Sequence, residues 1–314
     1  MAKILAVTEY YNEAKNIPGL VENMAAQSYP PDLWLIIDDG STDNSTELFE
    51  KNLKKFDIPY ILYTMAPKPK PDQNLKGRAY RKIEILNNEW VDSDRFDFVI
   101  LTGGDSRFTK FYTEIGVRVL QEFPEIGAMA GRCRSEPGTD TPMGGGKIVR
   151  WDIVRNTKGR YWDLDPDSLW NIIALSMGYK LLILKDLLMW TTRPTHMYAS
   201  SGFYNYGARM FYVGWNPIQS TIYTLILTIR RTHPHHFLRG YLHKYVEGTW
   251  TCKDEEIKRF YSFKRMILRI LGAVPMQDKA TIVYIGADGI SDKDLTDEYM
   301  KNVYSIVRKG FNQK

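Results

Sequence analysis

Two clusters of acidic side chains stand where apolar runs end, and their chemistry is the most telling feature of the chain. Residues 35–43 read LIIDDGSTD, so an apolar run leads directly into Asp38 and Asp39. A second apolar run, in residues 98–105 (FVILTGGD), ends in Asp105. Parallel strands bring their carboxyl ends to the ligand-binding edge of an α/β sheet. Carboxylates at two such ends could bind a nucleotide and a metal-diphosphate, which is the chemistry of a transferase.

Polar residues also follow the first apolar run. Thr8, Tyr10, Asn12 and Glu13 come between a predicted strand and a predicted helix. The carboxyl end of a strand before a helix is a natural place for a nucleotide. Asn12 and Glu13 could equally do no more than cap the helix, and the residues alone leave both interpretations open.

Two later segments could complete such a site. Gly77 and Arg78 lie among further cations, which could neutralise a diphosphate or form a solvated basic helix face. Residues 162–168 read WDLDPDS and hold three aspartates beside a tryptophan. A helix cap explains one aspartate but not three. A carboxylate such as Asp167 could instead take a proton from a sugar hydroxyl.

Strand and helix signals alternate along the first part of the chain. Strands are predicted at residues 4–7, 34–37, 60–63, 98–101, 126–130 and 180–184, and helices at 17–27, 44–55, 75–88, 111–123 and 167–177. This rhythm predicts an α/β fold with a mostly parallel, doubly wound sheet. From Trp215 to about Gly272 the pattern is helical, basic and aromatic. A strand at 281–285 and an amphipathic helix follow.

Composition narrows the class of protein. The 314 residues are 44% hydrophobic and 25% charged, with a net charge of +5, as in an ordinary globular protein. This charge does not require nucleic acid, but it suits phosphorylated ligands or an anionic membrane surface. Cys133 and Cys252 form no metal spacing and no disulfide framework, which favours a reducing compartment. No G-x-G-x-x-G follows the first strand and no P-loop motif occurs, so NAD and P-loop chemistry are disfavoured.

No membrane-spanning segment is predicted, because the longest apolar stretch, residues 217–229, is too short and too polar. The first residues lead directly into a strand pattern, so no signal peptide is expected. We therefore expect a cytoplasmic protein, with peripheral contact at the inner face of the cell membrane as a further expectation.

These motifs, in this order, resemble those of the inverting family 2 glycosyltransferases of the GT-A fold, over roughly residues 3–270. Residues 11–17 (YNEAKNI) resemble the family's Y-N-E-x-x-N-I signature, and residues 38–43 match its D-D-G-S-T-D signature. Gly77-Arg78-Ala79 is similar to the loop under the diphosphate. Gly103-Gly104-Asp105 occupies the D-x-D position, and residues 162–167 resemble the motif that carries the base.

The resemblance implies a role for each matching residue. Glu13 and Asp39 would hold the nucleoside, and Asp105 would ligate a divalent cation, Mn²⁺ or Mg²⁺. Asp167 would be the base, with Asp165 as runner-up, in a single direct displacement. The full set of residues predicted to bind the nucleotide sugar is Thr8, Tyr10, Asn12, Glu13, Asp38, Asp39, Gly77, Arg78, Gly104 and Asp105.

Two positions depart from the family's pattern. The first D-x-D aspartate is Gly103 here, and the family's histidine position is filled by Thr191 and Thr192. Residues 193–195 (RPT) match a stretch that often follows one or two histidines in the family. Both departures bear on metal binding rather than on the fold.

The resemblance implies a nucleotide-sugar-binding and catalytic domain over residues 1–200, whose part from about 132 to 200 receives the acceptor. A mostly helical, basic and aromatic region follows over 201–314. The implied partners are a nucleoside-diphosphate sugar and a glycan or lipid-linked acceptor, and no nucleic acid. In the helical region aromatic and basic residues interleave: Trp215, Tyr223, Phe237, Tyr241, Tyr245 and Trp250 with Arg230, Arg231, Arg239 and Lys244. This pattern suits a surface lying on a membrane, or aromatics packed in a core or a homodimer seam.

Other functions remain open. A sugar-nucleotide nucleotidyltransferase would usually carry a glycine-rich loop after the first strand, and residues 8–16 contain no glycine. A degenerate, non-catalytic binder of sugar nucleotides or glycans is suggested by Gly103 and the missing histidine. A glycoside hydrolase is disfavoured, because its carboxylates usually lie ~5–10 Å apart on different elements rather than along one turn.

Overall fold

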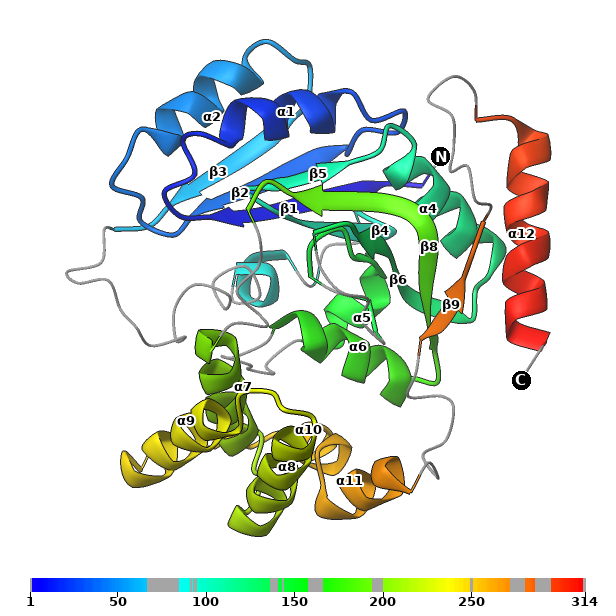
Figure 1. Ribbon diagram of the computed structural model, residues 1–314. Coiled ribbons are helices and arrows are strands. Elements are labelled where there is room, and N and C mark those ends of the chain that lie inside the picture. Colours follow the sequence, from blue (N-terminus) through cyan, green and yellow to red (C-terminus); the bar gives the residue numbers. More distant parts are fainter. Residues whose placement is uncertain are drawn as a thin grey trace.

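The computed structural model describes residues 2–66, 85–90, 92, 95–135, 141–142, 144–157, 166–193, 200–248, 251–271, 280–285 and 295–312. A twisted sheet with helices on both faces forms its centre (Figure 1). Its strands are β1 (Ile4–Tyr10), β2 (Leu33–Asp38), β3 (Tyr60–Thr64), β4 (Phe98–Gly103), β5 (Ser106–Phe108), β6 (Ile126–Cys133), β7 (Ile148–Arg150), β8 (Lys180–Thr191) and β9 (Thr281–Val283). The strand order is β3-β2-β1-β4-β7-β6-β8-β5, and β9 pairs with β8.

The sheet is mostly parallel, as predicted. β1 pairs in parallel with β2 on one side and with β4 on the other, while β7 runs antiparallel between β4 and β6. The strands that follow β1 in sequence, β2 and β3, therefore lie on one side of it, and β4 lies on the other. The register places Tyr10 opposite Asp38 and Glu9 opposite Gly103. Both acidic strand ends thus flank the carboxyl end of β1, where ligands of open α/β sheets bind.

Burial on both faces explains the nearly continuous apolar runs of the central strands. Along β1, Ile4 and Ala6 join the hydrophobic core on one face, and Leu5 and Val7 join the core on the other. The first face is covered by α1 (Ile17–Ala25), α2 (Ser45–Leu53), α4 (Tyr112–Glu122) and α12 (Asp297–Asn312). The second face is covered by α5 (Trp151–Arg155) and α6 (Pro166–Ser176). The predicted helix 75–88 lies mostly outside the described residues, which resume with a short helical segment over Leu86–Trp90.

A group of helices lies beyond α6, below the sheet in Figure 1. They are α7 (Ser200–Tyr212), α8 (Pro217–Ile229), α9 (Pro234–Val246), α10 (Glu255–Phe260) and α11 (Phe263–Ile270). Glycines let α7 and α9 cross closely, because a Cβ on Gly207 would lie 1.9 Å from the carbonyl oxygen of Phe237. A capping box starts α8: Asn216 Oδ1 accepts the N–H of Gln219, and Gln219 Oε1 accepts the N–H of Asn216.

The end of the chain returns to the sheet. β9 extends the sheet beside β8, and α12 packs its buried Val303 and Val307 into the core on the α4 face. β9 and α12, which lie in the part of the chain expected to be mostly helical, therefore pack on the sheet. None of the described helices is long and apolar enough to cross a membrane.

Candidate active site

The loops after β1 and β2 interlock. Asn12 adopts φ = 53°, a left-handed conformation that asparagine tolerates better than most residues. Its Oδ1 accepts the N–H of Thr42 at 2.8 Å, and its own N–H donates to Ser41 Oγ at 3.0 Å. The N–H of Glu13 donates to Ser45 Oγ at 2.8 Å. The two motifs recognised in the sequence are thus halves of one structure.

Hydrogen bonds to Asp38 stabilise this pair of loops. It is almost fully buried, and its Oδ1 accepts the N–H of Ser41 at 2.8 Å while its Oδ2 accepts the hydroxyl of Thr46. Asp39, the next residue, is equally buried, and its N–H donates to the carbonyl of Tyr10 at 3.0 Å. Asp38 therefore shapes the loop and the start of α2, and Asp39 lies where that loop joins the end of β1.

Thr8 and Tyr10 lie inside the sheet layer rather than on its edge. Trp34 Nε1 donates to Thr8 Oγ1 at 2.8 Å, and the Thr8 hydroxyl also bonds to that of Thr102. The ring of Tyr10 packs on Phe49, and burial raises the pKa of its phenol. Both side chains have partners within the core, so any contact of theirs with a nucleotide stays a prediction.

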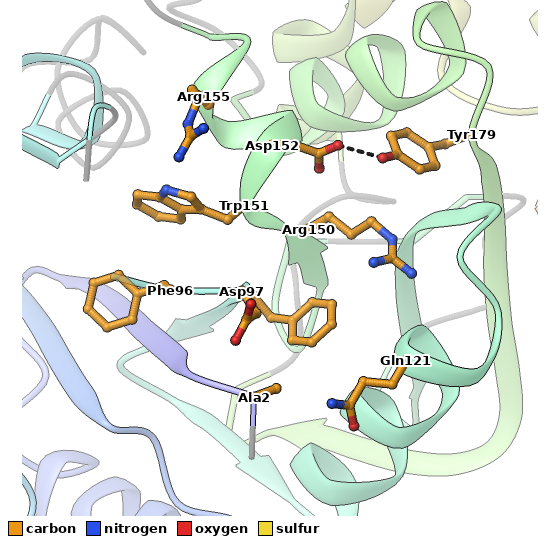
Figure 2. Close-up of a pocket in the computed structure, with 10 residues that line it drawn as sticks. Ala2, Phe96, Asp97, Gln121, Arg150, Trp151, Asp152, Arg155 and Tyr179 are labelled. Carbon is orange, nitrogen blue, oxygen red and sulfur yellow. Dashed lines mark hydrogen bonds between the residues drawn. The ribbon is translucent and has the colours of Figure 1, made fainter. Parts of the chain in front are cut away.

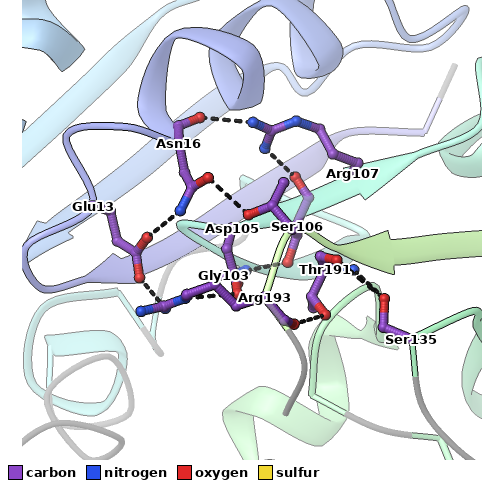
Figure 3. Close-up of polar contacts among 10 residues, drawn as sticks. Glu13, Asn16, Gly103, Asp105, Ser106, Arg107, Ser135, Thr191 and Arg193 are labelled. Atoms are coloured by element: carbon purple, nitrogen blue, oxygen red, sulfur yellow. Dashed lines mark hydrogen bonds and ion pairs between the residues drawn. The ribbon is translucent and has the colours of Figure 1, made fainter.

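Three distant segments meet at the mouth of the site (Figure 3). The Glu13 carboxylate, just before α1, accepts Asn16 Nδ2 on Oε2 at 2.7 Å and the guanidinium of Arg193 on Oε1. Arg193 follows β8, and its Nε donates to Asp105 Oδ2 at 3.3 Å. The N–H of Thr192 donates to the carbonyl of Asp105 at 3.0 Å. One guanidinium thus joins the carboxylates that follow β1 and β4.

Burial sets the electrostatics of this group. Desolvation raises the pKa of the Glu13 carboxyl, and the hydrogen bond from Asn16 and the charge of Arg193 only partly offset it. The Glu13 side chain is 6% exposed, whereas that of Arg193 is 61% exposed. Arg193 therefore reaches from the solvent side onto a carboxylate that is nearly buried.

Gly104 brings the end of β4 against the Glu13 loop. A Cβ at this position would lie 2.7 Å from Glu13 Cγ and 3.1 Å from Tyr10 Cβ. Real Cβ atoms do not approach so closely, so only glycine fits without a shift. The N–H of Gly103 donates to Ser106 Oγ at 2.8 Å, which closes the turn that presents Asp105.

The threonine at the family's histidine position has a structural role. Thr192 Oγ1 donates to Asn16 Oδ1 at 2.7 Å, and Arg107 Nη2 donates to the carbonyl of Asn16 at 2.8 Å. These bonds tie the residue after β8 to the loop before α1. Sequence reasoning did not single out Arg193 or this tie. The only signal was the likeness of residues 193–195 to a family stretch, which assigned no role.

Several predicted residues fall outside the description. Gly77, Arg78 and Asp165 lie outside the described residues, and Asp167 is described only as the second residue of α6, without its side chain. Their convergence with Asp39 and Asp105 therefore stays a prediction.

The chemistry of the acidic pair fits a hard divalent cation. Such an ion prefers oxygen ligands and, on a diphosphate, needs only one or two protein carboxylates. Glu13 and Asp105 both bind the guanidinium of Arg193, so this positively charged group lies where a divalent cation would bind. Among the described residues, no three His, Cys, Asp or Glu side chains gather into a metal-binding group.

A cavity of about 650 Å³ lies at the opposite edge of the sheet from this site (Figure 2). Its lining includes Ala2 before β1 and Asp97 before β4, so it faces the amino ends of these strands. Its charged groups have protein partners: Arg150 Nε donates to the carbonyl of Ile126 at 2.7 Å, and Tyr179 Oη donates to Asp152 Oδ2 at 2.5 Å. This cavity is not where parallel strands present their ligand-binding ends.

Comparison with known proteins agrees with this geometry. Residues 6–66, which contain both interlocking motifs, match the family model described as glycosyl transferase family 2. The mannosyltransferase PcManGT from Pyrobaculum calidifontis has a similar structure, with 14% identity over 100% of this chain and 88% of that chain and a TM-score of 0.54. TarS from S. aureus matches at 15% identity over 79% of this chain and 44% of that chain, with a TM-score of 0.47. No curated protein matches the sequence.

The mostly parallel sheet, its flanking helices and the likeness to PcManGT show that the chain has the GT-A fold of glycosyltransferases. The likeness to glycosyl transferase family 2 is carried by residues 6–66, the segment that contains both interlocking motifs.

Proposed function

We propose that this chain moves a sugar from a nucleoside-diphosphate sugar to a hydroxyl of a glycan or lipid-linked acceptor, with inversion at the transferred carbon. The observation that carries the proposal is the meeting of Glu13 and Asp105 on one guanidinium, beside the interlocked loops at the end of β1. Acidic and amide groups converge there at the switch point of the sheet, where a nucleotide would bind.

In this proposal Glu13 and Asp39 hold the nucleoside, and the close approach of Gly104 leaves the backbone of the β4 turn facing the diphosphate. Arg78, outside the described residues, adds positive charge. The similar structure of PcManGT was solved with GDP-Man and Mn²⁺, which supports a nucleotide-sugar donor here. The nucleoside base and the sugar of the donor are not specified by these residues.

The chemical step we propose is a single displacement with Asp167 as base and Asp165 as the alternative. The base takes the proton of the acceptor hydroxyl, and the acceptor oxygen bonds to the anomeric carbon. The bond from that carbon to the diphosphate oxygen breaks, and the nucleoside diphosphate leaves with the electron pair. Asp167 lies in the first turn of α6, so its backbone is fixed by a helix of the domain.

Asp105 is the residue that would hold a divalent cation. When bound, the cation would supply positive charge that stabilises the departing diphosphate. In the described structure Asp105 Oδ2 accepts a hydrogen bond from Arg193. A divalent cation on Asp105 would therefore lie where the guanidinium of Arg193 now lies.

A donor screen tests the proposal. UDP-, GDP- and dTDP-sugars are offered with Mn²⁺ or Mg²⁺ and a panel of glycans, and release of the nucleoside diphosphate is measured. Acceptor-dependent release supports the transferase. Binding without any release would indicate the non-catalytic binder. Pyrophosphate formed from a nucleoside triphosphate would indicate the nucleotidyltransferase.

The aromatic residues for which the sequence left a membrane surface and a packed core open fall on both sides. Tyr245 is 56% exposed, and Trp250 lies outside the described residues. Trp215, Phe237 and Tyr241 are buried: Trp215 and Phe237 pack on each other and on Tyr223, and Tyr241 packs on Phe211. They form the core of this helix group, which was the alternative interpretation. The aromatic residues that are buried cannot also lie on a bilayer.

A different set of residues supports peripheral membrane contact. Along α8, Ile218, Leu225 and Ile229 are 63%, 59% and 82% exposed. Their spacing of seven and four residues places them on one face of the helix. Arg230 and Arg231 follow directly and are exposed. We propose that this apolar stripe with adjacent cations rests on an anionic membrane surface, near a lipid-linked acceptor.

Co-sedimentation with vesicles tests this contact. The wild type should bind vesicles rich in phosphatidylserine and not neutral ones, and the double variant Leu225→Gln/Ile229→Gln should lose most of that binding. Ile282→Gln, on exposed β9, removes a comparable apolar side chain elsewhere and serves as control. Equal binding by the double variant and the wild type would remove the proposal.

A further inference from the structure

The described site already contains a cation of its own. Arg193 lies between Glu13 and Asp105, at the place that the donor's diphosphate and its metal would need. The two carboxylates come from loops more than ninety residues apart, and the arginine comes from a third segment. Nothing in local sequence requires this arrangement, so it reflects what the folded site demands: two close carboxylates need a positive charge.

The arginine is placed so that it can move. Glu13 is 6% and Asp105 17% exposed, so both carboxylates are held by their surroundings, while the Arg193 side chain is 61% exposed. A guanidinium carries five N–H donors. Those bonded to the two carboxylates come from Nη2 and Nε, and Nη1 donates to no described residue. Donors thus remain on the solvent side, where a diphosphate would arrive.

On the proposed function, a divalent cation and this guanidinium compete for the carboxylate of Asp105, while Glu13 holds the guanidinium beside it. Arg193 is tethered there, so its effective concentration is high whether or not metal is present. A free metal ion must displace it from Asp105, which takes away one of its two carboxylate partners. A diphosphate changes this balance, because arginine forms strong bidentate hydrogen bonds with phosphate oxygens. Arg193 released from Asp105 then has a new partner.

We propose that Arg193 is the resident counter-ion of the metal site: it occupies the place of the divalent cation in the donor-free protein and yields it when metal and diphosphate arrive together. The inference rests on the proposed nucleotide-sugar function and specifies how its metal is admitted. Linkage then applies in both directions, so the diphosphate raises metal affinity and the metal raises diphosphate affinity by one factor. Arg193 increases that factor by weakening the binding of metal alone.

The test measures binding rather than turnover. Mn²⁺ affinity is measured by calorimetry or electron paramagnetic resonance without nucleotide, and GDP, UDP and dTDP affinities are measured with and without Mn²⁺. In Arg193→Met, Mn²⁺ alone should bind about tenfold more tightly, because its competitor is gone. In the presence of Mn²⁺, whichever of GDP, UDP and dTDP the wild type binds most tightly should bind the variant about tenfold more weakly. The coupling factor should therefore fall on both counts.

Arg118→Met is the matched control. Arg118 is a part-exposed arginine on α4 that also contacts two carboxylates, Glu114 at 2.8 Å and Asp297 at 3.2 Å, away from the site. Its loss changes the net charge equally and should leave Mn²⁺ affinity unchanged. Thermal unfolding confirms that each variant is folded, and Arg193→Gln replaces Arg193→Met if the latter does not fold.

The outcomes separate the inference from the function on which it rests. If Arg193→Met binds Mn²⁺ alone no more tightly than the wild type, or if Arg118→Met gains as much, the inference is wrong while the donor function stands. If none of GDP, UDP and dTDP binds the wild type with or without Mn²⁺, the proposed function itself fails.

Discussion

A single methyl group at Gly104 should damage the site, and the same methyl one residue earlier should not. A Cβ on Gly104 would lie 2.7 Å from Glu13 Cγ and 3.1 Å from Tyr10 Cβ. Among the described residues, a Cβ on Gly103 would meet Asp105 Oδ1 and Ser106 Oγ, each at 3.2 Å. The pair Gly104→Ala and Gly103→Ala therefore tests how tightly the β4 turn must approach the Glu13 loop.

The contact distances give the size of the effect. Ordinary contact begins at 3.4 Å, so alanine at 104 requires a shift of 3.4 − 2.7 = 0.7 Å, against 3.4 − 3.2 = 0.2 Å at 103. The first shift falls on atoms close to the backbone of Tyr10 and Glu13, and the second on the ends of two side chains. Forcing extra carbon into such a contact costs about 1–3 kcal/mol. At about 2–4 °C per kcal/mol, Gly104→Ala should lower the melting temperature by roughly 2–12 °C.

Thermal unfolding and calorimetric titration with the nucleoside diphosphate check the prediction. Because Glu13 must move with its partner Arg193, Gly104→Ala should also weaken nucleotide binding by about tenfold, which corresponds to about 1.4 kcal/mol. Gly103→Ala should change both quantities much less. If the two variants behave alike, the close approach of Gly104 to Glu13 is not what positions this part of the site.

Two further predictions concern the carboxylates. Burial raises the pKa of the Glu13 carboxyl above its ordinary value, so its contribution to stability is fully present below that ordinary value and is lost as pH rises through the raised one. Glu13→Gln should therefore gain stability relative to the wild type as pH rises above the ordinary range of a glutamate carboxyl, while losing nucleotide affinity. A stability difference that does not vary with pH in urea unfolding would contradict this. Asp167→Asn should abolish transfer while calorimetry shows unchanged donor binding. Retained turnover in that variant would shift the role of base to Asp165.

The placement of the acidic residues could be predicted from the sequence because it follows from strand geometry. Asp38, Asp39 and Asp105 end apolar runs that become β2 and β4, and the two strands flank β1. Once the sheet is parallel and doubly wound, those ends share one edge. The helices between the strands followed from the same alternation. Bonds between the loops, such as that from the N–H of Thr42 to Oδ1 of Asn12, were not foreseen because they depend on loop conformation.

Side-chain direction was harder to predict than element position. Thr8 stands next to the edge in sequence, yet its hydroxyl binds Trp34 and Thr102 on the neighbouring strands. The aromatic residues of the helical region posed the same problem. An amphipathic pattern does not reveal which face is covered until the helices are packed, and so Trp215 is buried while Ile229 is exposed.

Arg193 could not be foreseen for a further reason: it meets Glu13 across 180 positions, through a long side chain at the end of β8. Its presence nevertheless agrees with both departures from the family's pattern. Gly103 removes a carboxylate from the edge, and Thr192, at the histidine position, is bonded to Asn16. Each departure takes away a ligand that a metal could use, and Arg193 adds a competing positive charge. If the chain binds a divalent cation as proposed, all three features weaken its hold on the free ion, and the diphosphate would supply much of the coordination.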